Sequence, residues 1–134
     1  MNYGNVQGQK AVQQYGQVAV QSRGEDASPH RMIQMLLEGA VEKVNIAKAY
    51  MAQGNVAEKG SHISWAMSII DGLYLSLDME AGGELAENLA GLYEYSKERL
   101  FEANVKNDPE ALDEVATLLN QIRAGWEGIA DQVD

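Results

Sequence analysis

The stretch that decides the fold is residues 28–54, which read SPHRMIQMLLEGAVEKVNIAKAYMAQG. Serine is a good N-cap, proline suits the first helical position, and the closing glycine suits a helix end. Between these signals, apolar side chains recur at every third or fourth position: Ile33, Leu36, Ala40, Val44, Ala47 and Met51. The spacing predicts an amphipathic helix of about 25 residues, roughly 37 Å long.

Three further helices are expected after this one. The second begins at Asn55, where Glu58 completes a capping-box-like pair, and continues to a break at Gly82-Gly83. The third covers about residues 84–104, and Asp108-Pro109 opens the fourth. Their stripes are Ile63, Ala66, Ile70, Leu73 and Leu77, then Leu85, Leu89, Leu92, Ser96, Leu100 and Ala103, then Leu112, Val115, Leu119, Ile122, Trp126 and Ile129. With short connections and no period-two strand pattern, the sequence predicts an all-α fold, an antiparallel up-and-down four-helix bundle.

Residues 1–27 differ in composition from the rest of the chain. They are rich in glutamine and glycine and poor in large apolar side chains, which is typical of a flexible tail. Nevertheless Val12, Tyr15, Val18 and Ala19 share one helical face. We therefore expect residues 1–27 to be a flexible N-terminal segment with a short docking helix that packs on the bundle, and residues 28–134 to be the bundle domain. Tyr15 and Val18 would then cover an apolar groove when no partner is bound.

The charge balance excludes some classes of partner. Ten basic and twenty acidic side chains give a formal charge of −10, whereas proteins that bind nucleic acid are usually basic on the face that meets the phosphates. Anionic membrane surfaces are disfavoured for the same reason. The N-terminus lacks the pattern of a signal peptide, and no apolar run approaches the roughly twenty residues that span a bilayer. We expect no nucleic acid, no membrane insertion and a cytoplasmic location.

Residues with catalytic or ligand chemistry are few. The chain has no cysteine and two histidines, His30 and His62, so thiolate chemistry and the paired Glu-x-x-His motifs of di-iron bundles are excluded. No phosphate-binding loop or nucleophile motif is present. We expect no enzyme activity, no cofactor and no metal site. His30, in the first turn of its helix, is expected to have a polar role facing solvent or a partner.

The helices carry more apolar side chains than a narrow bundle seam requires. This surplus comprises Met32, Met35, Leu37, Val41, Ile46 and Tyr50 on the first helix, Trp65, Met67, Ile69, Tyr74 and Leu75 on the second, and Tyr93, Tyr95 and Phe101 on the third. A wider core would account for part of it. Adaptable methionines near a groove also suit the binding of a helical partner, so the pattern favours a binding module.

The sequence resembles the flagellar secretion chaperone FliS family. The run at residues 28–40 (SPHRMIQMLLEGA) is similar to the opening helix of that family. The likeness continues in order, through IIDGL (69–73), SLD (76–78), GGELA (82–86), Asn88-Leu89, Leu92-Tyr93, Ala103-Asn104, NDP (107–109), Arg123 and Trp126. It covers nearly everything from Tyr15 onward. Two positions depart from the family pattern, since tyrosine is common at Leu37 and leucine is common at Met32.

The resemblance implies a cytosolic export chaperone. Its client would be the C-terminal segment of flagellin, which is unstructured before assembly and helical in the filament. The chaperone would wrap that segment along its surface, prevent premature polymerisation and deliver it to the flagellar type III export apparatus. Some family members also contact an anti-sigma factor or other assembly regulators.

Candidate contacts combine the resemblance with helical-face reasoning. Tyr15 and Val18 belong to the covering segment. The groove contacts are expected to be Met32, Met35, Leu36, Ile63, Met67, Ile70, Tyr74, Leu89 and Tyr93. The protein is expected to be a monomer or a weak homodimer. The alternative is a dimeric helical adaptor or regulatory protein without a chaperone role, whose dimer would bury these grooves.

Overall fold

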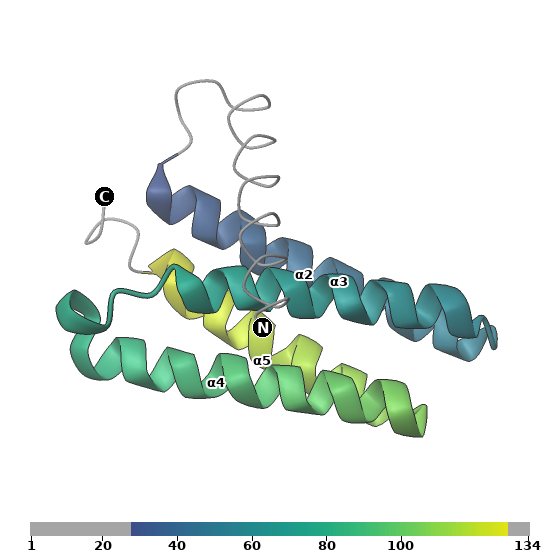
Figure 1. Cartoon of the computed structure of the whole chain (residues 1–134). Helices are drawn as coiled ribbons and strands as arrows, with labels where there is room; N and C mark the ends of the chain where they lie inside the picture. The colour runs from purple at the N-terminus through teal and green to yellow at the C-terminus, as the bar shows by residue number, and fades with distance from the viewer. Residues whose placement is uncertain (1–27, 129–134) are drawn as a thin grey trace.

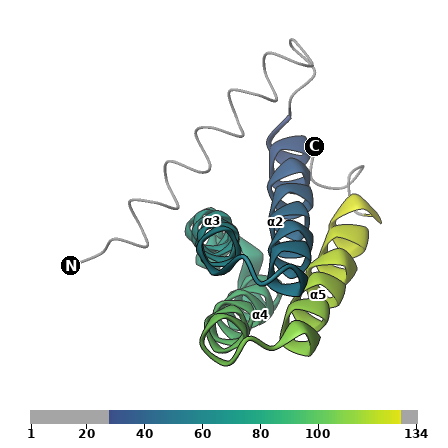
Figure 2. The same cartoon turned by 90° about the vertical axis from the view of Figure 1, so that its right-hand side faces the viewer.

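A computed structural model describes residues 28–128, which form four helices: α2 (Pro29–Ala52), α3 (Val56–Leu75), α4 (Met79–Lys106) and α5 (Pro109–Gly128). Helix α2 packs against α3 and α5, and α4 packs against the same two neighbours from the opposite corner. Figure 2 shows the helices in this order around a shared interior. The described part contains no strand, and none of its helices is long and apolar enough to cross a membrane. The predicted all-α, up-and-down bundle is confirmed.

Side-chain caps start three of the helices where the sequence predicts. Ser28 Oγ accepts a hydrogen bond from the Arg31 backbone N–H at 3.1 Å, and Asn55 Oδ1 accepts one from Glu58 N–H at 3.1 Å. Asp108 does the same for the amide of Glu110 at 3.0 Å. Each cap satisfies a donor that has no partner inside its helix.

The boundary between the second and third helices was predicted only in part: the helical backbone is interrupted at Gly83 as expected, but the second helix ends earlier and an additional helical turn precedes the glycines. Helix α3 ends at Leu75, and α4 begins at Met79 rather than after the two glycines. The reason is Asp78, whose carboxylate accepts hydrogen bonds from the amides of Glu80 and Ala81 and so caps a new helix ahead of the glycines. Gly83 then lies inside α4 as a kink with φ 51° and ψ −128°, a left-handed φ that glycine adopts readily. Figure 1 shows this turn at the left-hand end of the bundle.

The interior is filled by the predicted stripes and by part of the surplus. The largest fully buried side chains are Leu36, Leu37 and Val44 of α2, Ile63, Ile69, Ile70 and Leu73 of α3, Leu100 of α4, and Leu112, Val115 and Leu119 of α5. Leu37, Ile69 and Tyr93 therefore belong to a core wider than a coiled-coil seam. Burying one such aliphatic side chain contributes about 1.5–3 kcal/mol.

Buried polar contacts join the start of α3 to the end of α4. Lys59 is only 5% exposed, and its Nζ donates to the Asn104 carbonyl at 3.0 Å and to Asn107 Oδ1 at 3.1 Å. The ammonium thereby neutralises carbonyl groups and dipole charge at the C-terminus of α4. Nearer the middle of α3, the carboxylate of Asp71 pairs with Lys97 of α4.

Candidate binding groove

An apolar groove lies at the end of the bundle where α3 turns into α4. Helices α4 and α5 meet at their short connection and diverge towards the end of α5, as both views show (Figures 1 and 2). Because the two helices separate there, the apolar stripe of α4 is only partly covered. Leu85 is 54% exposed and Leu89 is partly buried, although both were expected to lie on the bundle seam.

Three hollows meet at Trp126, and we call them together the Trp126 groove. The first, of about 380 Å³, lies between α2 and α5 and is lined by Pro29, His30, Met32, Ile33, Leu36, Ser76 and Trp126. The second, of about 290 Å³, includes Ile33, Leu37, Leu77, Leu85, Leu89, Tyr93, Ile122 and Trp126. The third, of about 350 Å³, lies between α4 and α5 and is lined by Leu85, Leu89, Leu92, Leu118, Gln121, Ile122, Gly125 and Trp126. The lining is mostly apolar, with His30, Ser76, Asp78 and Gln121 as its polar members, as expected of a site for an apolar helical face.

A reciprocal contact between α2 and α5 fixes the floor of this groove. The rings of His30 and Trp126 stack with centroids 4.8 Å apart and planes 7° from parallel. Trp126 Nε1–H donates to the His30 carbonyl at 2.9 Å, and His30 Nε2 hydrogen-bonds the Trp126 carbonyl. His30 is 4% exposed, so of the two expected roles the solvent-facing one was wrong, while the partner-facing one stays a prediction because His30 lines the groove. The stacked partner lies 96 residues away in sequence, which local reasoning does not reach.

Exposed apolar side chains also gather around the α3–α4 turn, outside the lining of the groove. Tyr74 and Leu75 close α3, and Met79 opens α4; their exposed fractions are 39%, 40% and 50%. With Leu85 they place four of the large exposed apolar residues within one short stretch of chain. Such a concentration on a protein surface marks an interaction site more often than isolated exposed residues do.

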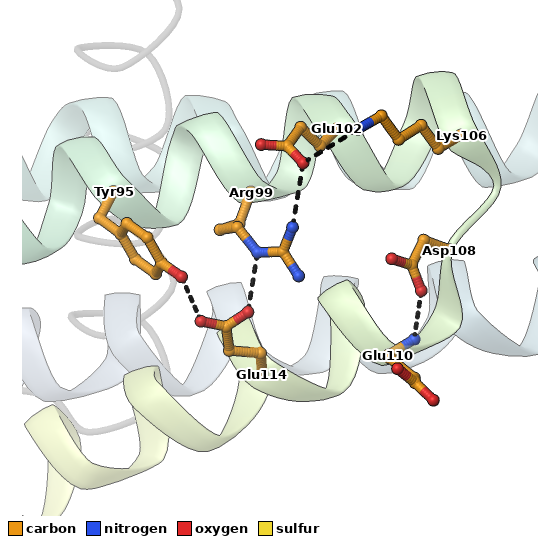
Figure 3. A network of polar contacts seen from close by, with 7 residues as sticks. All are labelled: Tyr95, Arg99, Glu102, Lys106, Asp108, Glu110 and Glu114. Atoms are coloured by element: carbon orange, nitrogen blue, oxygen red, sulfur yellow. Dashed lines mark hydrogen bonds and ion pairs between the residues drawn. The ribbon is translucent and has the colours of Figure 1, made fainter.

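The groove continues between α4 and α5 into a hollow of different chemistry. This acidic hollow, of about 490 Å³, is lined by Leu92, Tyr95, Glu110, Asp113, Glu114, Thr117, Leu118 and Gln121. Figure 3 shows Tyr95 and Arg99 of α4 converging on Glu114 of α5. The Tyr95 hydroxyl donates to this carboxylate, and Arg99 Nε donates to it at 2.7 Å. These two hydrogen bonds, Tyr95 first, lower the pKa of Glu114 below its usual value. Among residues 28–128, no three His, Cys, Asp or Glu side chains are grouped to hold a metal ion.

The predicted groove contacts differ in whether they line the Trp126 groove and in how exposed they are. Met32, Leu36, Leu89 and Tyr93 line the Trp126 groove, whereas Met35, Ile63, Met67, Ile70 and Tyr74 are not among its lining residues. Four of the predicted groove contacts are buried, with 2% or less of their surface accessible: Leu36, Ile63, Ile70 and Tyr93. Met32, Met35, Met67 and Leu89 are partly buried. The predicted covering residues Tyr15 and Val18 lie outside the described residues.

Several groove residues were not among the candidates. Leu77, Leu85, Ile122 and Trp126 were assigned to the seam of the bundle because each continues an apolar stripe. Periodicity identifies residues that share a helical face, but it does not show whether a neighbouring helix covers that face. One signal was available: the apolar run resumes directly after Gly82-Gly83, where a glycine pair weakens regular packing.

Comparison with known proteins places the chain in a family. The family model described as "Flagellar protein FliS" matches residues 11–133. The Pseudomonas aeruginosa protein "Flagellar secretion chaperone FliSB" is 48% identical to this chain, and the match covers 90% of this chain and 96% of that protein. "Flagellar secretion chaperone FliS" of Salmonella typhimurium is 44% identical with 89% of each chain covered, and the Bacillus subtilis protein of the same name is 28% identical with 75% and 74% covered. The predicted resemblance is confirmed, and this chain belongs to the FliS family.

Proposed function

We propose that this protein is a cytoplasmic export chaperone that binds the disordered C-terminal segment of flagellin. It keeps that segment from polymerising and delivers it to the flagellar type III export apparatus. Family membership and the names of the relatives support the export role. The observation that carries the choice of site is the open Trp126 groove, whose apolar lining suits the apolar face of a helical segment.

The physical demands of the role agree with the shape of the groove. A disordered client loses conformational entropy when it becomes ordered, so useful affinity requires a long apolar contact rather than one deep pocket. The groove provides this length because it follows α4 from Leu85 to Leu92 and reaches the start of α2 at Met32. Contacts that are dispersed and non-covalent also allow the client to be released at the export gate.

The candidate residues take different parts in this proposal. Met32 and Leu89 are partly buried and line the groove, so we assign them direct contact with the client, together with the exposed Leu85. The buried Leu36 and Tyr93 form the floor and act by setting its shape. Ile63 and Ile70 support the floor from within the core, as the buried face of α3.

Three candidates point to a second stretch of contact. Met35, Met67 and Tyr74 retain accessible surface outside the groove, and a client that wraps around the bundle would reach them. Residues 1–27, with Tyr15 and Val18, would cover the groove when it is empty. Deleting these residues should then tighten client binding or increase self-association, and unchanged values of both would contradict the covering role.

The working form of the chaperone is proposed to be a monomer or a weak homodimer, because a tight dimer through the groove would exclude the client. Contact with an anti-sigma factor or another assembly regulator would compete for the same surface. Sedimentation velocity distinguishes these states. An obligate dimer that does not dissociate when client is added would favour the adaptor alternative.

The direct test is a calorimetric titration of the full chain with a synthetic peptide of the flagellin C-terminal segment. We expect one-to-one binding with a gain of helix by circular dichroism. About half of the Leu85 side chain is exposed and would be buried by the client. Leu85→Ala removes this apolar contact and should weaken affinity roughly tenfold. Phe101→Ala is the matched control, since Phe101 is 62% exposed on α4 and does not line the groove. No binding at tens of micromolar, or equal losses in both variants, would contradict the proposal.

A further inference from the structure

We propose that the acidic hollow between α4 and α5 receives a lysine or arginine side chain of the bound segment, about three to five helical turns from the part seated at Trp126. This inference rests on the proposed function and adds a chemical requirement to it. The client must carry a cation at a defined distance from its apolar anchor, in addition to an apolar face.

The hollow is a continuation of the apolar groove. Leu92, Leu118 and Gln121 line both the acidic hollow and the third part of the Trp126 groove. A helical segment laid between α4 and α5 can therefore run from one to the other without leaving the surface. Along α5, Trp126 and Glu110 are separated by roughly 24 Å at about 1.5 Å per residue, which equals four to five turns of a helix. The nearer edge of the hollow, at Leu118, lies about two turns from Trp126.

The charges at the far end of this path are negative. Glu110, Asp113 and Glu114 all line the hollow. Glu114 already pairs with Arg99, and Asp113 pairs with Lys48 at 2.7 Å. No cation of the described residues pairs with the carboxylate of Glu110. The site thus has one carboxylate more than the cations around it, next to apolar side chains that would shield a charge brought there.

Charge complementarity decides which occupant the path fits. A second copy of this chain carries the same charge of −10 and would meet like charge at the hollow. An anionic membrane surface would be repelled in the same way. A client segment with an apolar face and a lysine or arginine meets both halves of the path, apolar at Trp126 and acidic at Glu110.

The magnitude of the effect follows from the exposure of the acidic side chains. Asp113 and Glu114 retain 55% and 42% of their side-chain surface, so a new ion pair there is partly screened by water. One exposed ion pair of this kind changes a binding constant by about two- to fivefold. Reversing the charge of one partner replaces attraction by repulsion, so it roughly doubles the change in binding free energy. The contribution must also shrink as salt is added, because the Debye length falls to about 3 Å at 1 M.

The test uses the full chain and the flagellin C-terminal peptide at low and high salt. Glu110→Lys should weaken binding by about four- to twenty-five-fold at low salt, and the difference should largely vanish near 1 M salt. Glu98→Lys is the matched control, since it makes the same change of net charge at an exposed position of α4 outside the hollow, and it should change affinity less than twofold. A peptide in which lysine and arginine are replaced by glutamine should bind Glu110→Lys and the unaltered chain equally well.

The outcomes separate the inference from the function on which it rests. If the unaltered chain binds the peptide but Glu110→Lys and Glu98→Lys behave alike, the cation site is overturned and the export function stands. The same holds if the glutamine peptide still distinguishes Glu110→Lys from the unaltered chain. If the unaltered chain does not bind the peptide, both are overturned. A change in self-association by Glu110→Lys without a change in client affinity would assign the hollow to a second copy instead.

Discussion

Replacing Lys59 by methionine tests whether the buried ammonium at the end of α4 stabilises the bundle. Its two acceptors, the Asn104 carbonyl and the Asn107 amide oxygen, lie 3.0 and 3.1 Å away. A hydrogen bond from a charged donor contributes about 1.5–3 kcal/mol to stability. Lys59 makes two of them, but the cost of removing its ammonium from water cancels part of their combined contribution. Methionine fills similar volume but leaves the carbonyl in the last turn without a donor. We therefore expect Lys59→Met to lower the free energy of unfolding by about 2–4 kcal/mol.

The measurement is urea unfolding followed by circular dichroism, with Lys48→Met as the matched control. Lys48 is 45% exposed in a surface ion pair with Asp113, so its loss should cost at most about 1 kcal/mol. Binding of the flagellin segment should be unchanged in Lys59→Met, because Lys59 lies at the opposite end of the bundle from the Trp126 groove. If both variants lose the same small amount, the desolvation of the Lys59 ammonium cancels its hydrogen bonds and the reasoning fails.

Three further predictions concern the kink at Gly83, the buried Tyr93 and the contact between His30 and Trp126. Gly83→Ala forces a side chain into a left-handed φ and should cost about 1–2 kcal/mol, whereas Gly91→Ala, in open helical surroundings, should gain up to about 1 kcal/mol in the same urea assay; a gain at both positions would refute the strain. Burial raises the pKa of Tyr93 to about 12. The unfolded chain therefore releases this proton first, and stability should fall by about 2 kcal/mol between pH 10 and 12; Tyr93→Phe should lack this component, and an unchanged pH profile would contradict it. Trp126→Phe keeps the stack on His30 but removes the indole donor, and should lower stability by about 1 kcal/mol without loss of helix content; a loss of helix would mean that the indole N–H organises the fold.

Much of the fold could be predicted because local chemistry determines it. Ser28, Asn55 and Asp108 cap helices through their own side chains, and such caps depend on residues only two or three positions away. The stripes to which Leu36, Ile70 and Leu119 belong, one on each of three helices, identified core residues because a 3.6-residue period places the members of a stripe on one face of its helix. The break at Gly83 was predicted correctly, but the second helix was extended too far because Asp78 was not considered as the start of a helix. Both signals were visible.

The site was harder to predict because it depends on how the helices diverge. Leu85 and Leu100 belong to the same stripe of α4, yet one is 54% exposed and the other is fully buried. The difference arises from the separation of α4 and α5 towards the end of α5, which is a property of the assembled bundle (Figures 1 and 2). For the same reason Ile63 and Ile70, chosen from their helical face, lie in the core. The acidic hollow likewise combines residues of α4 and α5 that are unremarkable within each helix alone.

The stack of His30 on Trp126 has a consequence for the order of events during protein synthesis. It joins the first and last described helices, and closing so long a loop is among the most costly contacts in entropy. Residues 28–106 can emerge from the ribosome and form helices before α5 does. The side of the groove that α5 contributes is absent until that helix has been translated. On the proposed function, a nascent chain without α5 would lack one side of the client site. The walls of the groove are brought together only when α5 has packed against α2 and α4.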